Sequence, residues 1–289
     1  MPVLETVEVS IRFGGVQANR DVSVALGEWE IVGIIGPNGA GKTTLFNLIT
    51  GFHRPDSGRI LHRGRDITRL PVHARAELGI GRTFQNVGLV KGATVRDNLL
   101  TAQHRHARYG PIAALLGSPT ARATERELHR HAEELADALG LAELLDTQVA
   151  GLPYGTLKRV EIATVLASEP EILLLDEPSS GMGPEEAHEL GDLLLRLRRE
   201  FGLSILMIEH HVPLVLRICD YVYCLDFGEL VTHGAPDDVR RHPQVVAAYL
   251  GEDPDPAVLA VEAQLEAFAD LVDAELPDAD PPDAAEEGG

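Results

Sequence analysis

Residues 36–43 have the types and the spacing of a loop that binds phosphate. They read Gly-Pro-Asn-Gly-Ala-Gly-Lys-Thr. Glycines let successive backbone N–H groups turn toward one anion, and a helix starting after them adds its positive end. Lys42 would reach the β- and γ-phosphates of a triphosphate, Thr43 would offer its hydroxyl to Mg²⁺, and Thr44 would contact the α-phosphate. The predicted nucleotide-binding residues are Gly36, Pro37, Asn38, Gly39, Ala40, Gly41, Lys42, Thr43 and Thr44.

Two carboxylates follow an apolar run at residues 172–175. The run Ile-Leu-Leu-Leu is typical of a parallel strand buried on both faces, and Asp176 and Glu177 come directly after it. Open α/β sheets bind ligands at the carboxyl ends of their strands. We therefore expect Asp176 to hold Mg²⁺ through water and Glu177 to face an attacking water. The alternative is that both belong to a helix N-cap region.

Two further residues are candidates for contact with a nucleotide. The apolar stretch 204–208 ends in Glu209-His210-His211, so one histidine is expected to face the γ-phosphate. His210 is favoured because it comes first after the strand, and a structural histidine is the alternative. Phe13 precedes a glycine turn upstream of the phosphate loop. It could stack on a purine or pack in the core, and the residues alone leave both open.

The elements that position these groups follow from the hydrophobic pattern. The apolar run 31–35 predicts a strand that leads into the phosphate loop. Alternation at 7–13, a turn at Gly14-Gly15 and a second run at 22–26 predict an antiparallel hairpin. Residues 72–168 look mostly helical, with a periodic segment at about 120–138. Their histidines are interleaved with Arg and Glu, which favours a solvated helix face over a metal site.

Composition and charge restrict the class of protein. The 289 residues are 44% hydrophobic and 24% charged, which suits one large or two small globular domains. We expect a cytosolic protein, because no run approaches the ~18 apolar residues of a membrane span and the N-terminus lacks a signal sequence. The two cysteines, Cys219 and Cys224, are expected to be buried, reduced thiols.

The net charge of −20 is concentrated in a C-terminal extension. Residues 252–289 hold 13 acidic groups and no Lys or Arg, which leaves 32 acidic and 25 basic residues upstream, a net charge of −7. No nucleic-acid partner is expected, because such binding depends on basic surface. Apolar residues spaced by three and four predict a helix at about 256–276, followed by a disordered tail. This helix would dock on residues 1–251 or pair with its copy in a second subunit, and a wholly disordered tail is the alternative.

Several segments, in this order and spacing, resemble the ATPase subunits of ABC transporters. They are the phosphate loop, Arg-Thr-Phe-Gln with Gln85, Leu-Pro-Tyr-Gly-Thr at 152–156, Leu-Leu-Leu-Asp-Glu-Pro and Ile-Glu-His. Thr-Gly-Phe after the first helix and the ending Ala-Tyr-Leu-Gly are similar to branched-chain amino-acid importer ATPases. The resemblance covers about residues 3–251.

The resemblance implies an α/β fold, a P-loop NTPase ABC cassette at 1–251. Its parts would be an antiparallel β subdomain, a RecA-like parallel-sheet core and a helical subdomain at about 86–168. It also implies ATP and Mg²⁺ as ligands and a head-to-tail dimer of identical or different ATPase subunits. Phe13 would stack on adenine, Gln85 would touch Mg²⁺, Glu177 would activate water and His210 would contact the γ-phosphate. Pro153, Tyr154, Gly155 and Thr156 would act as a signature segment on the partner's nucleotide, with a helix beginning near Leu157.

The expected function is that of a transport motor at the cytoplasmic face of the cell membrane. Its partners would be integral membrane permease subunits and, indirectly, a substrate-binding protein. Import of branched-chain or related amino acids is favoured. Urea import, lipopolysaccharide export and a soluble, non-transport ABC ATPase are the alternatives, and a single phosphate loop without long heptads argues against the last.

Four positions depart from the family pattern. Pro153 replaces a common serine and so removes a hydroxyl and an N–H donor from the signature segment. Leu157 and Lys158 stand where Gln and Arg are usual, and Trp29 stands where a glycine usually precedes the strand of the phosphate loop. An active ATPase is still expected.

Overall fold

The computed structural model describes residues 1–83, 88–103 and 118–249. The chain divides into two compact units, Met1–Val245 and Val246–Gly289. The predicted acidic extension at 252–289 lies outside the described residues, as do Gln85, His104 and His106. Within the described ranges, no helix combines the length and the apolar character needed to cross a membrane.

The N-terminal part of the first unit is a four-stranded antiparallel sheet in the order β2-β1-β4-β5. This confirms the predicted hairpin, with its turn at Gly14-Gly15. The alternation in the first strand changes phase at Glu8, a bulge with a left-handed φ of 48°. Val9 and Ile11 are therefore buried, but Val7 is only half-buried. The strands are β1 (Leu4–Phe13), β2 (Val16–Leu26), β4 (Ser57–His62) and β5 (Arg65–Asp66).

The centre of the first unit is a six-stranded sheet in the order β10-β9-β3-β8-β7-β6. All neighbours are parallel except β9 and β10, which form an antiparallel hairpin. The apolar runs at 31–35, 172–175 and 204–208 form three adjacent strands whose residues are all buried, as predicted. The strands are β3 (Ile31–Ile35), β6 (Ile80–Arg82), β7 (Ile172–Asp176), β8 (Ser204–Ile208), β9 (Tyr221–Asp226) and β10 (Glu229–Gly234).

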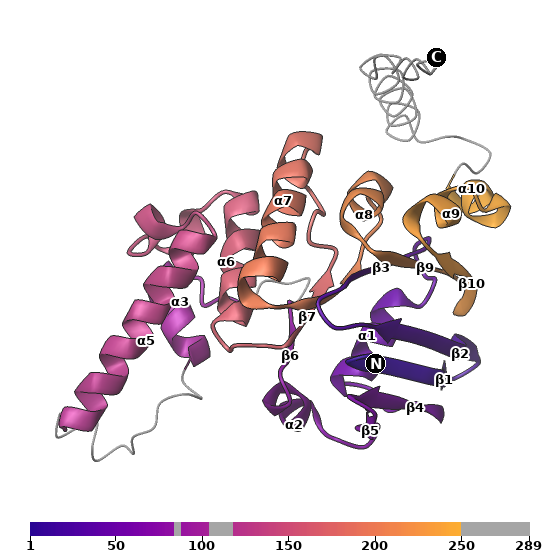
Figure 1. Cartoon of the computed structure of the whole chain (residues 1–289), viewed down its shortest axis with the longest axis horizontal. Coiled ribbons are helices and arrows are strands. Elements are labelled where there is room, and N and C mark those ends of the chain that lie inside the picture. The colour runs from indigo at the N-terminus through magenta and orange to yellow at the C-terminus, as the bar shows by residue number, and fades with distance from the viewer. Residues whose placement is uncertain (84–87, 104–117, 250–289) are drawn as a thin grey trace, which may run out of the picture. The chain divides into compact units, whose positions relative to one another are not determined.

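Both faces of the central sheet are covered. Helix α1 (Lys42–Thr50) packs between it and the antiparallel sheet, in one core with Ile34, Leu174 and Leu206. Helices α7 (Pro184–Phe201) and α8 (Val212–Ile218) cover the opposite face (Figure 1). A Cβ at Gly33 would lie 2.7 Å from the Val215 side chain, so α8 packs directly on β3. Side chains at alternate positions of each central strand therefore pack against opposite layers, so both faces of these strands are buried.

A group of helices precedes β7 in the chain and contains the expected periodic segment. Helix α5 spans Pro119–Ala138, close to the predicted 120–138. The interpretation of 72–168 as mostly helical missed β6, because three residues are too short for a periodic signal. The other elements of this stretch are α2 (Val72–Glu77), α3 (Val95–Ala102), the 3₁₀ turns η2 (Ala142–Leu144) and η3 (Val149–Gly151), and α6 (Tyr154–Leu166).

The end of the described chain consists of short helices after the β9–β10 hairpin. Helix α9 spans Pro236–Arg240, and α10 spans Pro243–Tyr249 and crosses the boundary between the two units. The two cysteines are free and buried, as predicted. Burial raises the pKa of Cys224 to about 11 and that of Cys219 further, so both remain thiols at neutral pH.

Candidate active site

The phosphate loop lies between β3 and α1, in the predicted order of strand, loop and helix. Gly36, Gly39 and Gly41 all have positive φ angles, of 152°, 84° and 91°. A Cβ at Gly36 would lie 2.1 Å from the carbonyl oxygen of Leu225, and one at Gly41 would lie 2.3 Å from that of Ala18. The loop therefore needs glycine for its backbone conformation and, at two positions, for the close approach of neighbouring chain.

Lys42 is held inside this loop. Its Nζ donates to the carbonyl oxygens of Gly36, at 2.5 Å, and Pro37, at 3.0 Å. Burial lowers the pKa of Lys42, while the negative charges of Glu177 and Asp176 act in the opposite direction. The structure thus brings the loop lysine and the two strand-end carboxylates close enough to interact. Thr43, the residue predicted to meet Mg²⁺, is exposed and Thr44 is half-buried.

The carboxylates at the end of β7 differ in their surroundings. Asp176 is 1% exposed, and its Oδ2 accepts a hydrogen bond from Arg82 at 2.8 Å. Among the described residues, none forms a hydrogen bond with its buried Oδ1. Glu177 is half-buried and has a left-handed φ of 48°, a conformation in which few glutamates are found. Its N–H donates to the Ile208 carbonyl of the neighbouring strand at 2.9 Å. These bonds fix both residues at the carboxyl edge of the sheet.

Arg82 is a site residue that the sequence interpretation missed. Its guanidinium also donates to Asn47 at 2.7 Å and to Thr50 at 3.3 Å, and it lies over the Phe46 ring, 5.4 Å from the centroid. Arg82 therefore joins α1 to Asp176, the last residue of β7. The available signal was an arginine two residues after the buried Ile80, in a segment leading to Gln85.

The histidines after β8 have different environments. His210 is exposed, whereas His211 is the N-cap of α8 and is half-buried. Burial lowers the pKa of His211, and the charge of Glu209 opposes this shift. The residue chosen from the sequence, His210, is thus the exposed one of the two histidines.

Phe13 does not belong to the core. It is the last residue of β1, 45% exposed, and its ring meets His53 edge-on with centroids 5.1 Å apart. Of the two interpretations of Phe13, the core aromatic is therefore wrong.

The signature segment forms the start of a helix rather than a loop before one. Helix α6 begins at Tyr154, so the expectation of a start near Leu157 was wrong. Pro153 is the N-cap, with φ −57° and ψ 154°, and it supplies no side-chain cap. A proline suits the start of a helix because its fixed φ matches and its missing N–H would be unpaired there. The first-turn N–H groups are those of Tyr154, Gly155 and Thr156.

The signature segment does not lie beside the phosphate loop of its own chain. Figure 1 shows α6 with α3 and α5 on one side of β7, and α1 on the other. The Tyr154 ring lies against Gly181, where a Cβ would be 3.3 Å from the ring. Lys158, one of the departures, is buried in an ion pair with Glu161 at 3.2 Å and lies 5.8 Å from the Tyr154 ring centroid.

The backbone of Trp29, another of the departures, shows why a glycine is usual at this position. Trp29 has a left-handed φ of 60° and is 63% exposed. Such a backbone favours glycine, and here a tryptophan adopts it.

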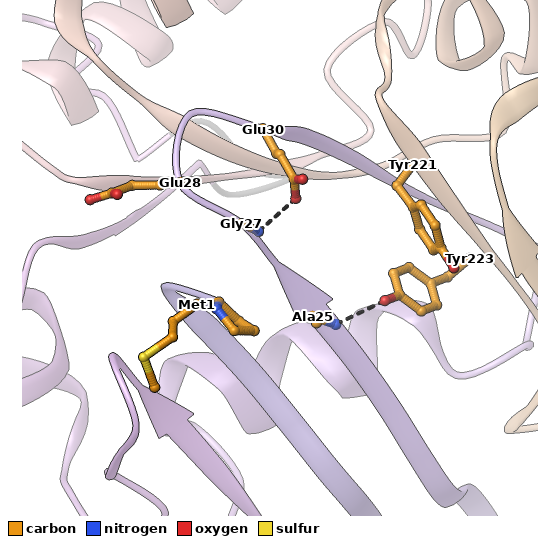
Figure 2. A pocket seen from close by; sticks show the side chains of 8 residues that line it. Met1, Ala25, Gly27, Glu28, Glu30, Tyr221 and Tyr223 are labelled. Carbon is orange, nitrogen blue, oxygen red and sulfur yellow. Dashed lines mark hydrogen bonds between the residues drawn. The ribbon is translucent and has the colours of Figure 1, made fainter.

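A hollow beside the N-terminus lies at the opposite edge of the sheet (Figure 2). Its walls include Glu28 and Glu30, which precede β3, and Tyr221, the first residue of β9. In Figure 2, Glu30 accepts a bond from the Gly27 N–H and Tyr223 accepts one from the Ala25 N–H, at 2.7 and 3.1 Å. Because the phosphate loop follows the other end of β3, this hollow is separate from the site built by the motifs.

A glycine-rich loop between a parallel strand and a helix, with two carboxylates at the end of β7, which is separated from β3 by one strand of the same sheet, defines a P-loop nucleoside triphosphatase. The sequence model of the ABC transporter family matches residues 19–180. A second model, described as branched-chain amino acid ATP-binding cassette transporter, matches residues 229–255. The chain therefore belongs to the ABC transporter family, as its motifs predicted, and its activity is ATP hydrolysis coupled to transport.

Named relatives and solved structures agree with this assignment. The chain is 43% identical over 251 residues to the high-affinity branched-chain amino acid transport ATP-binding protein LivG of Salmonella typhimurium, covering 87% of this chain and 98% of that protein. BraF of Pseudomonas aeruginosa, which has the same description, is 41% identical over the same length and shares. The ADP conformation of MJ1267, an ATP-binding cassette of an ABC transporter, has a TM-score of 0.76 at 32% identity, covering 87% of this chain and all of that one.

Proposed function

We propose that this chain hydrolyses ATP at the cytoplasmic face of a membrane to drive import of branched-chain or related amino acids. The observation that carries the ATPase site is that the loop of Lys42, after β3, and the carboxylates Asp176 and Glu177, at the end of β7, lie at the carboxyl edge of one parallel sheet. The substrate class is supported by the transport named for LivG and BraF and by the match at residues 229–255.

The phosphate loop would hold the nucleotide. The backbone N–H groups of residues 36–44, other than Pro37, would surround the phosphates, and Lys42 would exchange its two carbonyl contacts for phosphate oxygens. Thr44 would meet the α-phosphate, and exposed Phe13 would offer its ring face to adenine.

The residues around Asp176 suit a magnesium ion. A buried carboxylate oxygen without a hydrogen-bond partner is the kind of atom that a water ligand of Mg²⁺ can satisfy, and Asp176 Oδ1 has no such partner in the part of the chain that the structure describes. Thr43 would contribute its hydroxyl, and Gln85, outside the described residues, would complete the set. When bound, the ion would neutralise charge on the phosphates.

The remaining polar groups at the sheet edge would act on the attacking water and the γ-phosphate. Glu177 would orient the water and accept its proton as the oxygen attacks phosphorus and the bond to the ADP oxygen breaks. His210 would donate a hydrogen bond to a γ-phosphate oxygen. The held backbone of Glu177 supports this role, because positioning supplies much of the catalysis in phosphoryl transfer.

A second ATPase subunit, identical or different, would complete each site head to tail. Pro153, Tyr154, Gly155 and Thr156 would face the partner's nucleotide with the N–H groups of the first turn of α6. Figure 1 shows α6 and the chain's own α1 on opposite sides of β7, which supports action in trans. Membrane permease subunits would receive the resulting motion, and a substrate-binding protein would act through them.

Reconstitution tests this proposal. The chain would be co-purified with candidate permease subunits, placed in vesicles and assayed for ATP hydrolysis with and without an amino-acid-loaded binding protein. Loaded binding protein should stimulate hydrolysis several-fold, and the Glu177→Gln complex should show no stimulation. Stimulation by urea or lipopolysaccharide, and none by branched-chain amino acids, would overturn the substrate assignment while leaving the ATPase assignment intact.

A further inference from the structure

Glu209 is a buried carboxylate between the loops that carry Glu177 and His210. It follows β8 directly, and none of its surface is exposed. Among the described residues it has no ion pair with a cation. A buried carboxylate is costly unless it is hydrogen-bonded, so the groups that bind it are informative.

Its hydrogen bonds join two loops. Oε1 accepts from the backbone N–H of Ser179 at 2.8 Å, in the loop after Glu177. Oε2 accepts from the N–H groups of His210, at 3.1 Å, and His211, at 3.3 Å. The carboxylate therefore binds both loops at once, through bonds that its charge strengthens.

Its main chain adds a third connection. The Glu209 N–H donates to the carbonyl of Ile34 at 3.2 Å, two residues before the phosphate loop begins. Glu209 thus lies where the ends of β3, β7 and β8 meet. Substitution of its side chain would leave this backbone bond in place. It would therefore affect the loops of Glu177 and His210 rather than the phosphate loop.

The backbone of Glu177 needs such support. Its left-handed φ of 48° is unfavourable for a residue with a side chain and persists only where the surroundings hold it. A turn bond from Ser180 N–H to the Glu177 carbonyl, at 3.2 Å, and the bond from Ser179 N–H to Glu209 hold the following residues. Loss of the second bond would let the loop relax and move the Glu177 side chain.

We propose that Glu209 is a positioning residue for ATP hydrolysis, whose carboxylate fixes the loop of Glu177 and the loop of His210 relative to each other. This inference rests on the proposed roles of Glu177 and His210. Small displacements of groups that position a reaction can lower its rate about 10²-fold. The phosphate loop is not held by this carboxylate, so nucleotide affinity should depend little on it.

The first test is Glu209→Gln, which keeps the size but replaces one acceptor oxygen with an NH₂ group that cannot accept. We expect kcat to fall by roughly 10- to 100-fold, with the dissociation constant for ATP changed less than about 3-fold. The matched control is Glu171→Gln. Glu171 is a carboxylate just before β7, at the opposite end of that strand, where it pairs with Arg63. Its kcat should change less than about 2-fold.

A double-mutant cycle separates positioning from general destabilisation. If Glu209 acts through Glu177, adding Glu209→Gln to Glu177→Gln should lower the residual rate less than about 3-fold, because groups acting as a unit are not additive. An equal loss in both backgrounds would overturn the inference. Near-normal hydrolysis by the Glu177→Gln single variant would instead refute the proposed role of Glu177.

A second variant covers the case in which Glu209→Gln fails to fold. Glu209→Asp keeps the charge, but its side chain is one methylene shorter and cannot span both loops. We expect Glu209→Asp to lower kcat about 3- to 10-fold. In the Glu177→Gln background, the same substitution should lower the residual rate by much less. Unchanged kcat in a folded Glu209→Asp protein would overturn the proposal.

Discussion

The phosphate loop and the signature segment are both helix starts suited to phosphate, but they are built differently. The phosphate loop has glycine at each of its left-handed positions, and two of them are closed in by Leu225 and Ala18. The signature segment has a proline N-cap without a side-chain cap and a first residue, Tyr154, that is 45% exposed. The phosphate loop is thus enclosed by its own chain, whereas the signature segment is open.

This difference indicates which half of the nucleotide site the chain determines by itself. Neighbouring strands and loops fix the phosphate loop, so its conformation is set before a ligand arrives. In the first turn of α6, Tyr154 is exposed and Gly155 and Thr156 are half-buried. The N–H groups of such a turn have no partner within the helix, so a partner subunit's phosphate could satisfy them. The following variants test this contrast.

Glu177→Gln should have the largest effect. The amide keeps the shape of the side chain but cannot accept a proton, so turnover should fall roughly 10²- to 10⁴-fold while ATP still binds. Measurement of kcat and of the dissociation constant for ATP checks this. ATP should also trap a dimer, visible by size-exclusion chromatography. Near-normal hydrolysis would show that Glu177 does not accept the proton of the attacking water. Catalysis could then no longer be assigned to the half of the site that contains the phosphate loop.

Arg82→Met should strongly destabilise the enclosed half. Removal of the arginine leaves the Asp176 carboxylate, 1% exposed, without its cation. Breaking one side of a buried pair costs about 3–5 kcal/mol. Urea unfolding measures the effect, and Arg82→Lys, which retains the charge, should lose less. A loss below about 1 kcal/mol in Arg82→Met would show that Asp176 does not depend on this pair.

Gly41→Ala should destabilise the protein more than Gly39→Ala, because the chain around Ala18 approaches position 41 closely. Both positions have positive φ, which costs an alanine about 1–2 kcal/mol. Only at Gly41 would the new Cβ also meet a backbone oxygen, at 2.3 Å, whereas Gly39 has open space. We expect about 2–4 kcal/mol for Gly41→Ala. Equal losses in thermal unfolding would mean that Ala18 moves freely and that the loop is less enclosed than described.

Pro153→Ser should have the smallest effect and should act on the open half. Serine restores a hydroxyl and an N–H at the N-cap of α6, so ATP-dependent dimerisation should tighten by about 0.5–1.5 kcal/mol, as for a typical hydrogen bond. Sedimentation in the Glu177→Gln background measures the association constant, with Pro153→Ala as the control. An unchanged constant would show that backbone N–H groups already satisfy the partner's phosphate.

Local signals predicted the central strands of the nucleotide-binding core. The three buried apolar runs became β3, β7 and β8 within one residue of the predicted bounds, because a strand buried on both faces has a continuous apolar sequence. The long helix α5 was clear from its period. The start of α6 also has a local signal, Pro153 at its N-cap. The predicted start near Leu157 was too late because the residues before it were interpreted as a loop.

The sequence by itself determined which residues come at the ends of the strands, and with them the phosphate loop, the two carboxylates and His210. Only the tertiary structure decided that Arg82 binds Asp176, 94 residues away, and that Glu209 binds the loop of Ser179, 30 residues away. Those contacts depend on the strand order β3-β8-β7-β6. Hydrophobic period and turn chemistry act over a few residues, whereas strand order is set by packing across the whole core.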